Sequence, residues 1–363
     1  MISGSVSQGC VRIDLVEFAP LSIPRKERFT IARGSSDVAD LVFVSVHSGG
    51  VSGQGCAAPT DVTKETIPTV LESLKRLSHL LSGFEFDRPR QVADEMDKRL
   101  PANPSAKAAI DMAVYDIAAR VAGKPLFEYL GGSRDRMPTD MTIGIMPAQA
   151  AVERTRRWVA AGFQSLKVKV GRDPKADLER LRAIRAAAGP AVELRVDGNQ
   201  GYTWSQALSF ARAARDLQVS VFEQPVSAED LEGMRVLAEQ SPIPVMADEM
   251  VLTPEDAKKL GWAKAARAVN LKLMKHGGLS RTMDVNTICE SAGFPTMVGC
   301  MGEPQLSIAA GLHFALAHKN VRWLDLDSHF NLAADPTAGL TFEAGNLIAP
   351  RKPGLGIDVE LPA

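Results

Sequence analysis

The chain of 363 residues predicts an α/β protein whose main part is a (β/α)₈ barrel. Five apolar, strand-like segments each end in a charged side chain, namely Lys169, Asp197, Glu223, Asp248 and Lys272. Successive members are 28, 26, 25 and 24 residues apart, which is about the length of one strand, one helix and two turns. Because the carboxyl ends of barrel strands gather at one mouth, we expect these side chains to lie together.

We expect residues 1–130 to form an α+β capping domain that carries active-site loops. Strands are expected over Val11–Phe18 and Asp40–Ser48, which are rich in β-branched and aromatic residues. Two long polar segments, Pro20–Asp37 and Gly53–Thr63, are expected to be loops, and loops of this length are usually functional or mobile.

A long helix is expected in the second half of the capping domain. Ser105 is a suitable N-cap for the alanine-rich segment that follows, and Gly123 with a proline two residues later marks its end. Asp111 and Asp116 on this helix are interpreted as polar contacts at its surface or at a domain junction.

The barrel is predicted over residues 131–330 and a tail over 331–363. The first strand is expected at Thr139–Met146 and the last at Val321–Leu326. Helices are expected at Ala148–Ala161, Asp177–Ala187, Ser205–Leu217 and Pro254–Leu260. Prolines and glycines in the tail predict short strands and turns that pack back on the capping domain.

The composition excludes several classes of partner. A formal net charge of −1 indicates no nucleic acid or other polyanion, and no apolar run is long enough to span a bilayer. The segment Met1–Cys10 lacks the pattern of a signal peptide. The four unclustered cysteines, Cys10, Cys56, Cys289 and Cys300, indicate free thiols in a reducing compartment. We expect a cytoplasmic protein without membrane partners, and assembly into a homo-oligomer stays open.

Three of the charged strand ends are carboxylates on consecutive strands. Asp197, Glu223 and Asp248 would repel one another unless a cation lies between them. A ligand set of oxygens only, without histidine or thiolate, favours Mg²⁺ over zinc or copper.

Lysines flank these acids. Lys167 and Lys169 are two residues apart on one strand, so their side chains share a face, and the apolar residues between and beside them suit the outer face. Both ammonium groups should therefore point into the barrel, where each lysine and a nearby cation would lower the pKa of the other. Lys272, four strands further round, should face them. Two amines on opposite sides of one site suit a 1,1-proton transfer.

The last strand ends in a second pair of acids. Asp325 and Asp327 also share a face, and further metal ligands there would bring an excess of negative charge. They suit a substrate ammonium group, and the alternative interpretation is a pair that caps the following turn.

The full set of motifs resembles the muconate-lactonizing subgroup of the enolase superfamily over nearly the whole chain. The matching segments are Lys167-Val168-Lys169, Asp197-Gly198-Asn199, Glu223-Gln224-Pro225, Ala247-Asp248-Glu249 and Asn270-Leu271-Lys272. The resemblance implies one Mg²⁺ per subunit on Asp197, Glu223 and Asp248. It also implies that Lys169 and Lys272 are the acid/base pair, with Lys167 in support, and that the reaction passes through an ene-diolate.

Within that subgroup, Asp325-Leu326-Asp327 with Gly299-Cys300-Met301 is similar to the dipeptide epimerases. This resemblance implies a dipeptide substrate whose ammonium group binds Asp325 and Asp327, and it adds Met301 and Glu303 to the substrate-binding residues. Arg33 or Arg25, in the first long loop, is the candidate for a substrate carboxylate.

Alternatives on the same scaffold are muconate cycloisomerase, N-acylamino acid racemase and o-succinylbenzoate synthase, whose substrates carry no ammonium group. A barrel that only binds a ligand or partner is the alternative from another class. The side chains of the dipeptide stay open.

Overall fold

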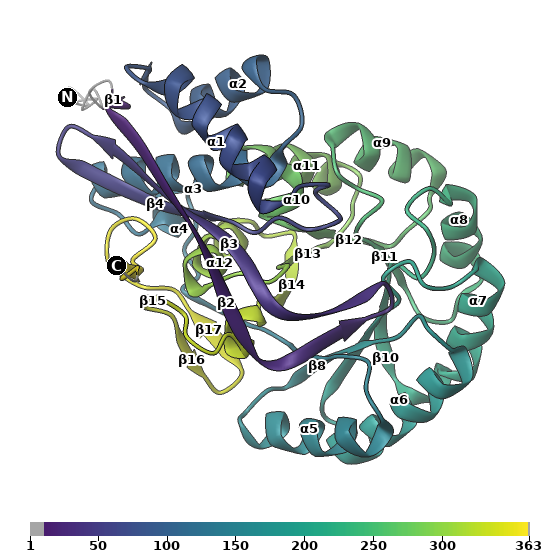
Figure 1. Ribbon diagram of the computed structural model, residues 1–363. Helices are drawn as coiled ribbons and strands as arrows, with labels where there is room; N and C mark the ends of the chain where they lie inside the picture. Colours follow the sequence, from purple (N-terminus) through teal and green to yellow (C-terminus); the bar gives the residue numbers. More distant parts are fainter. Residues whose placement is uncertain (1–10, 362–363) are drawn as a thin grey trace, which may run out of the picture.

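The computed structural model describes residues 11–361, and its centre is a parallel eight-stranded sheet (Figure 1). The strands pair in sequence order from β7 to β14, and a bridge between Thr139 and Leu324 joins the two outer strands into a barrel. This confirms the predicted fold. The strands are β7 (Met141–Ile143), β8 (Ser165–Lys169), β9 (Glu193–Asp197), β10 (Val219–Glu223), β11 (Val245–Ala247), β12 (Ala268–Leu271), β13 (Thr296–Gly299) and β14 (Val321–Asp325).

Helices cover the outside of the barrel (Figure 1). They are α5 (Ala148–Ala160), α6 (Pro174–Ala188), α7 (Trp204–Ala213), α8 (Leu231–Gln240), α9 (Pro254–Ala263), α10 (Leu273–His276), α11 (Leu279–Ser291) and α12 (Gln305–Ala317). Side chains define the starts of two of them: Thr203 and Thr253 each accept a hydrogen bond from the backbone N–H of the third residue of the helix that follows. The helix expected to reach Leu217 instead ends at Ala213, and the 3₁₀ helix η1 (Arg215–Leu217) follows.

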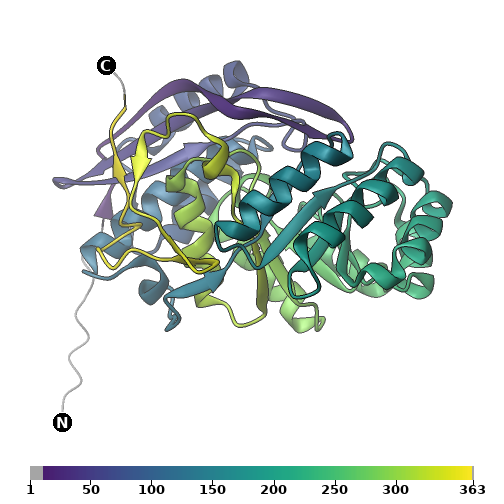
Figure 2. The same ribbon diagram turned by 90° about the horizontal axis from the view of Figure 1, so that it is seen from below.

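The capping domain places three antiparallel strands beside three helices and over the barrel (Figures 1 and 2). The sheet consists of β2 (Leu15–Ile31), β3 (Gly34–Ser48) and β4 (Val51–Ala57), with β3 in the middle. The helices are α1 (Ile67–Leu81), α2 (Pro89–Arg99) and α3 (Pro104–Val121), followed by the short α4 (Leu126–Tyr129). Strands β1 (Val11–Arg12) and β5 (Glu85–Phe86) form a separate antiparallel pair.

The prediction of a loop over Pro20–Asp37 is wrong, because β2 and β3 form one long hairpin there. Its prolines, Pro20 and Pro24, suggested a loop, because proline has no backbone N–H to donate within a sheet. However, β2 is an edge strand, where proline is tolerated if that position faces away from the neighbouring strand. The pairing is irregular between Pro24 and Phe29 and then resumes up to the tip at Ala32–Arg33. The hairpin thereby extends over the mouth of the barrel.

The prediction of a loop over Gly53–Thr63 is wrong in its first part, which belongs to β4. Glycines weakened the strand signal, but a Cβ atom on Gly53 or Gly55 would collide with the backbone carbonyl of Ala113 or Ala109 on α3. Small residues are therefore required for helix α3 to pack directly on this strand.

Helix α3 also joins the capping domain to the barrel. Asp111 is fully buried, and its carboxylate accepts hydrogen bonds from the Oγ (2.7 Å) and backbone N–H (3.1 Å) of Ser280 on α11. Asp116 accepts bonds from the backbone N–H groups of Gln54 and Leu355. The interpretation of both aspartates as polar contacts is confirmed, but both are buried and neither lies at the helix surface: Asp111 bonds to α11, and Asp116 bonds to β4 and the tail.

The tail folds back on earlier parts of the chain (Figure 2). Its elements are η2 (Ser328–Asn331), β15 (Thr337–Ala338), β16 (Thr341–Glu343), β17 (Asn346–Ile348) and β18 (Asp358–Val359). Strand β17 pairs with β6 (Arg136–Pro138), and the Ala333 N–H donates to the Pro24 carbonyl at 2.9 Å. The domain boundaries at 130 and 330 stay a prediction.

Cys56, Cys289 and Cys300 are free thiols, as expected, whereas Cys10 and the whole segment Met1–Cys10 lie outside the described residues. Within residues 11–361, no helix has the length and apolar character that crossing a membrane requires. The cytoplasmic location and the oligomeric state stay predictions.

The junction at Asp111 predicts a pH-dependent stability. Burial raises the pKa of Asp111 from its ordinary value of 3.8 to about 7. Between these two values the folded protein holds a proton that the unfolded chain has lost, so stability falls as the pH rises through this window. We expect the Asp111→Asn variant to lose less stability than the wild type between about pH 5 and about pH 8.

The measurement is the free energy of unfolding in urea at both pH values. Replacement of the exposed Glu72 on α1 by Gln is the control and should leave the wild-type slope. Equal pH slopes for the wild type and Asp111→Asn would contradict the assignment.

Candidate active site

A cavity of about 390 Å³ lies between the barrel mouth and the β2–β3 hairpin. Both faces contribute side chains, because the hairpin supplies residues from Arg25 to Arg33 and the strand ends supply the floor. The sequence-predicted site residues that line it are Arg33, Lys169, Lys272, Met301, Asp325 and Asp327. The other predicted residues, Lys167, Asp197, Glu223, Asp248 and Glu303, are buried behind this lining.

Lys167 and Lys169 point into the barrel from β8, as the alternation of the strand predicts. Lys169 Nζ lies 2.6 Å from Asp197 Oδ2. Lys167 is almost fully buried, and its ammonium contacts three carboxylates at 2.7 to 3.0 Å. These carboxylates are Asp197 at the end of β9, Glu223 at the end of β10 and Asp325 at the end of β14.

Lys272 approaches from the other side of the mouth, directly after β12. Its Nζ lies 2.7 Å from Asp248 Oδ2. A further buried lysine, Lys275 on α10, holds Asp248 from behind, with Nζ 2.8 Å from Oδ1 and 2.5 Å from the backbone carbonyl. Lys275 also donates to the Asn270 carbonyl at 2.9 Å, which fixes Asp248 to the neighbouring strand. Lys275 was not found from the sequence, because it lies on the short helix α10 and not at the end of a strand.

The pKa values of the buried lysines and carboxylates at the mouth depend on the charges that these groups exert on one another. Burial alone disfavours the charged form of each lysine, but neighbouring carboxylates outweigh it and raise the pKa of Lys167 and of Lys272. Burial and the nearby Asp197 raise the pKa of Glu223 to about 8. The expected lowering of the pKa is therefore not met at Lys167, where the surrounding carboxylates outweigh burial.

The acidic trio fits a hard divalent cation. Asp197, Glu223 and Asp248 offer only oxygen atoms, and among the described residues no histidine or cysteine bonds to them. Buried oxygens without a hydrogen-bond partner stand beside the trio: Oδ1 of Asn199, Oε2 of Glu249 and Oδ1 of Asn270. Because unpaired buried acceptors are rare, these atoms favour a cation over a purely internal network.

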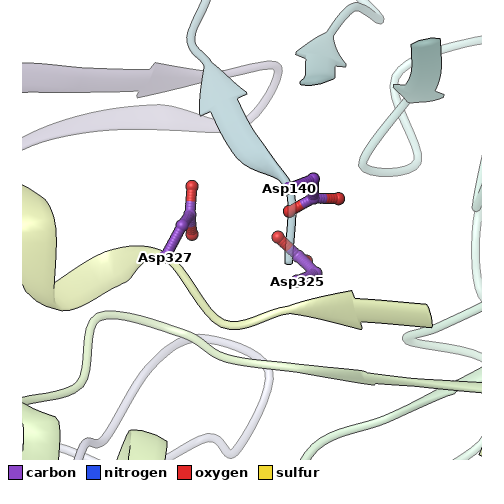
Figure 3. A group of neighbouring side chains, drawn as sticks. All are labelled: Asp140, Asp325 and Asp327. Atoms are coloured by element: carbon purple, nitrogen blue, oxygen red, sulfur yellow. The ribbon is translucent and has the colours of Figure 1, made fainter. Parts of the chain in front are cut away.

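A second group of acids is more compact. Asp140, Asp325 and Asp327 bring carboxylate oxygens within 4.8 Å of one another, close enough to hold a metal ion (Figure 3). Buried cations already offset two of them, because Arg195 lies 2.9 Å from Asp140 and Lys167 lies 2.7 Å from Asp325. Asp140, directly before β7, belongs to no motif and was not found from the sequence.

Asp327 is the member of this group whose charge is least compensated. Its Oδ2 accepts a hydrogen bond from the Thr142 backbone N–H at 2.6 Å. Burial and the neighbouring Asp325 raise its pKa to about 6. Both aspartates line the cavity, so a ligand cation can reach them.

The remaining predicted residues have different surroundings. Arg33, at the hairpin tip, lies 3.0 Å from Asp61 and 3.3 Å from Glu249. Met301 Sδ accepts a bond from Thr60 Oγ1 at 3.3 Å. Glu303 accepts from the Met301 backbone N–H at 3.0 Å, and burial raises its pKa to about 7. Glu303 thus supports the loop that carries Met301 and does not reach the cavity.

Comparison with known proteins assigns both parts of the chain. Residues 15–131 match the mandelate racemase/muconate lactonizing enzyme N-terminal domain, and residues 150–363 match the enolase C-terminal domain-like family. These matches confirm the resemblance predicted from the motifs.

Individual relatives agree with this assignment. The hydrophobic dipeptide epimerase of Enterococcus faecalis is 38% identical, over 96% of this chain and 99% of the relative. The L-Lys-D/L-Arg epimerase of Methylococcus capsulatus is 38% identical, over 94% of this chain and 96% of the relative. The dipeptide epimerase of E. faecalis, solved with Mg and L-Leu-L-Tyr, superposes with a TM-score of 0.93 at 36% identity, covering 95% of this chain and 99% of that one. Since these relatives are epimerases, the predicted assignment to the isomerases is confirmed.

Proposed function

Because the chain belongs to the mandelate racemase/muconate lactonizing enzyme family of the enolase superfamily, we propose that it is a Mg²⁺-dependent dipeptide epimerase. It would invert the α-carbon of the C-terminal residue. The observation that carries the proposal is the placement of Lys169 and Lys272 in one cavity, each bonded to a different member of the acidic trio.

The two lysines suit proton transfer at opposite faces of one carbon. The uncharged amine of one lysine takes the α-proton, and the electron pair of the C–H bond moves into the adjacent carboxylate. The ammonium group of the other lysine then returns a proton to the opposite face. Proton exchange with solvent restores both lysines, so the reaction needs no further reactant.

Asp197, Glu223 and Asp248 would hold the Mg²⁺. When bound, this ion supplies positive charge that stabilises the electron-rich carboxylate of the deprotonated substrate. Lys167 contributes to the same end from the protein, since it contacts two members of the trio and stays buried. Lys275 holds Asp248 in position through two hydrogen bonds and donates a third to the Asn270 carbonyl.

Asp325 and Asp327 would bind the ammonium group of the dipeptide. They lie at the end of β14 on the cavity wall, and the Thr142 N–H fixes the carboxylate of Asp327. Muconate, N-acylamino acids and succinylbenzoate precursors carry no ammonium group, so this pair favours the dipeptide over those alternatives. Two dipeptide epimerases among the relatives agree with that choice.

The metal assignment predicts a selective loss of affinity. Asp248→Asn should weaken Mg²⁺ binding by more than the roughly 10–100-fold that a change beside a metal ligand causes, because a direct ligand loses its charge. Asp327→Asn should leave the affinity near that of the wild type. Calorimetric titration of both chelator-treated variants with Mg²⁺ measures this. A loss confined to Asp327→Asn would move the metal to the group of Asp140, Asp325 and Asp327.

The two-base assignment predicts a one-sided defect. Lys169→Ala and Lys272→Ala should each reduce epimerisation by at least ~10²–10⁴, the usual contribution of a general base. One of them should still exchange the α-proton of one substrate epimer for deuterium in D₂O, because the remaining lysine serves that face. Lys258→Ala, on the outer helix α9, is the control. Wild-type racemisation in either lysine variant would contradict the assignment.

The ammonium site predicts a preference for free dipeptides. The double substitution of Asp325 and Asp327 by Asn should lower kcat/KM steeply, since each charge-assisted hydrogen bond contributes roughly 1.5–3 kcal/mol. N-acetylation of the dipeptide should have the same effect on the wild type. Mass spectrometry of L,L-dipeptide libraries in D₂O detects turnover as a one-dalton gain. A wild type that prefers N-acetyl or N-succinyl amino acids over every free dipeptide would instead be an N-acylamino acid racemase.

A further inference from the structure

Four arginines line the cavity, and one of them has no acidic partner. Arg33 pairs with Asp61 and Glu249, and Arg154 and Arg157 both pair with Glu27. Among the described residues, no carboxylate lies within ion-pairing distance of the guanidinium of Arg25. Its only hydrogen bond to these residues runs from Nε to Ser36 Oγ, at a long 3.5 Å.

The side chain of Arg25 is nevertheless held in place. Its strand is fixed to the tail, because Arg25 forms a β-bridge with Leu332 and the preceding carbonyl accepts from Ala333. The guanidinium stands 5.7 Å from the ring of Phe29. On the far side it lies so close to Gly302 that a Cβ atom there would come within 2.8 Å of Nη2. An aromatic ring and a glycine thus enclose a charge whose Nη1 and Nη2 donate to none of the described residues.

The half-buried guanidinium lines the cavity and has no acidic partner among the described residues, so it can pair with an anion that enters the cavity. Burial lowers the pKa of Arg25, and the acids that oppose this effect, Asp327 among them, do not touch it. The planar fork of the guanidinium matches a carboxylate through two parallel hydrogen bonds. The side chain therefore has the properties of a receptor for a carboxylate that enters the cavity.

We propose that Arg25 binds a side-chain carboxylate on the N-terminal residue of the dipeptide, so that the substrates begin with aspartate or glutamate. This inference rests on the proposed dipeptide epimerase function and specifies its substrate class. The protein would bind the first residue of the dipeptide at two places. Asp325 and Asp327 would bind the ammonium group of that residue, and Arg25 would bind its side-chain carboxylate.

The position of Arg25 assigns it to the first residue and not to the second. Two of its three electrostatic neighbours, Cys300 and Asp327, line the end of the cavity where the ammonium group would bind, and the third, Asp40, lies outside the cavity. Arg33 stands at the other end, beside Glu249, and its charge is already taken up by two acids.

The test compares isosteric substrates that differ by one charge. Glu-Ala and Gln-Ala should differ in kcat/KM by about 10–100-fold in favour of Glu-Ala, the range of a charge-assisted hydrogen bond. In Arg25→Gln this ratio should fall to near one. Arg28→Gln is the matched control, because Arg28 lies on the same strand, is exposed and pairs with Asp37 outside the cavity. It should keep the wild-type ratio.

Two further comparisons show which residue of the dipeptide supplies the carboxylate, and whether a lost preference comes from the missing charge or from unfolding. The ratio of kcat/KM for Ala-Glu to that for Ala-Gln should be the same in the wild type and in Arg25→Gln. If Arg25→Gln changed this ratio but left the ratio of Glu-Ala to Gln-Ala unchanged, the assignment of Arg25 to the first residue would be overturned. Arg25→Glu should reverse the preference toward dipeptides that begin with lysine. Thermal unfolding of each variant shows whether it is folded, and a folded Arg25→Gln that keeps the wild-type ratio overturns the inference.

The inference and the proposed function fail in different ways. Turnover of many dipeptides with a wild-type Glu-Ala to Gln-Ala ratio near one overturns the role of Arg25 alone. Absence of deuterium incorporation into every dipeptide overturns the epimerase proposal and the inference with it.

Discussion

The ion contacts of Lys167 are the interaction on which the rest of the site depends. One fully buried ammonium group contacts acids from β9, β10 and β14, so it connects the proposed metal trio with the acids of the last strand. Loss of that charge would leave Glu223 and Asp325 without a cationic partner and Asp197 with Lys169 alone, and an unpaired buried charge costs several kcal/mol. Because such networks seldom add net stability, their presence at a barrel mouth points to a chemical role.

The barrel and the hairpin contribute different properties to the cavity. The groups proposed to transfer protons or to hold the metal, such as Lys169 and Asp248, stand on or directly after barrel strands, whose backbone is fixed on both sides by the sheet. Groups that would contact the substrate side chains, such as Arg25 and Phe29, stand on the β2–β3 hairpin. The tail ties this hairpin down, since Asn331 exchanges two hydrogen bonds with the backbone of Glu27. Substrate preference can therefore change through the hairpin without any change in the proton-transfer groups.

The sequence predicted the features that repeat or that follow strand alternation. The barrel and the inward direction of Lys167 and Lys169 follow from a steady spacing and from a period of two. The hairpin was missed because prolines on an edge strand resemble a loop, and β4 was missed because its glycines are explained only by helix α3 against it. Such features depend on neighbours that are distant in the chain.

The same limit applies to the site. Asp140 and Lys275 belong to no motif, and their roles appear only when Arg195 and Asp248 are seen beside them. The sequence also led us to expect a lowered pKa for Lys167, because the number of acids that surround this lysine in the folded protein could not be seen from the strand alone. The sequence thus predicted which charged residues lie at the mouth of the barrel, whereas the ion pairs that they form could be seen only in the structure.

Pairing is also what distinguishes the charges that serve the fold from those left for a ligand. Arg33 is neutralised by acids of the protein, and so are Arg154 and Arg157, so these cations hold the cavity wall together. The guanidinium of Arg25 and the carboxylate of Asp327 are compensated far less, and they occupy the same end of the cavity. A ligand that is complementary to both must carry an ammonium group and a carboxylate a few bonds apart. A free N-terminal acidic amino acid has that arrangement, and an N-acylated one has lost half of it.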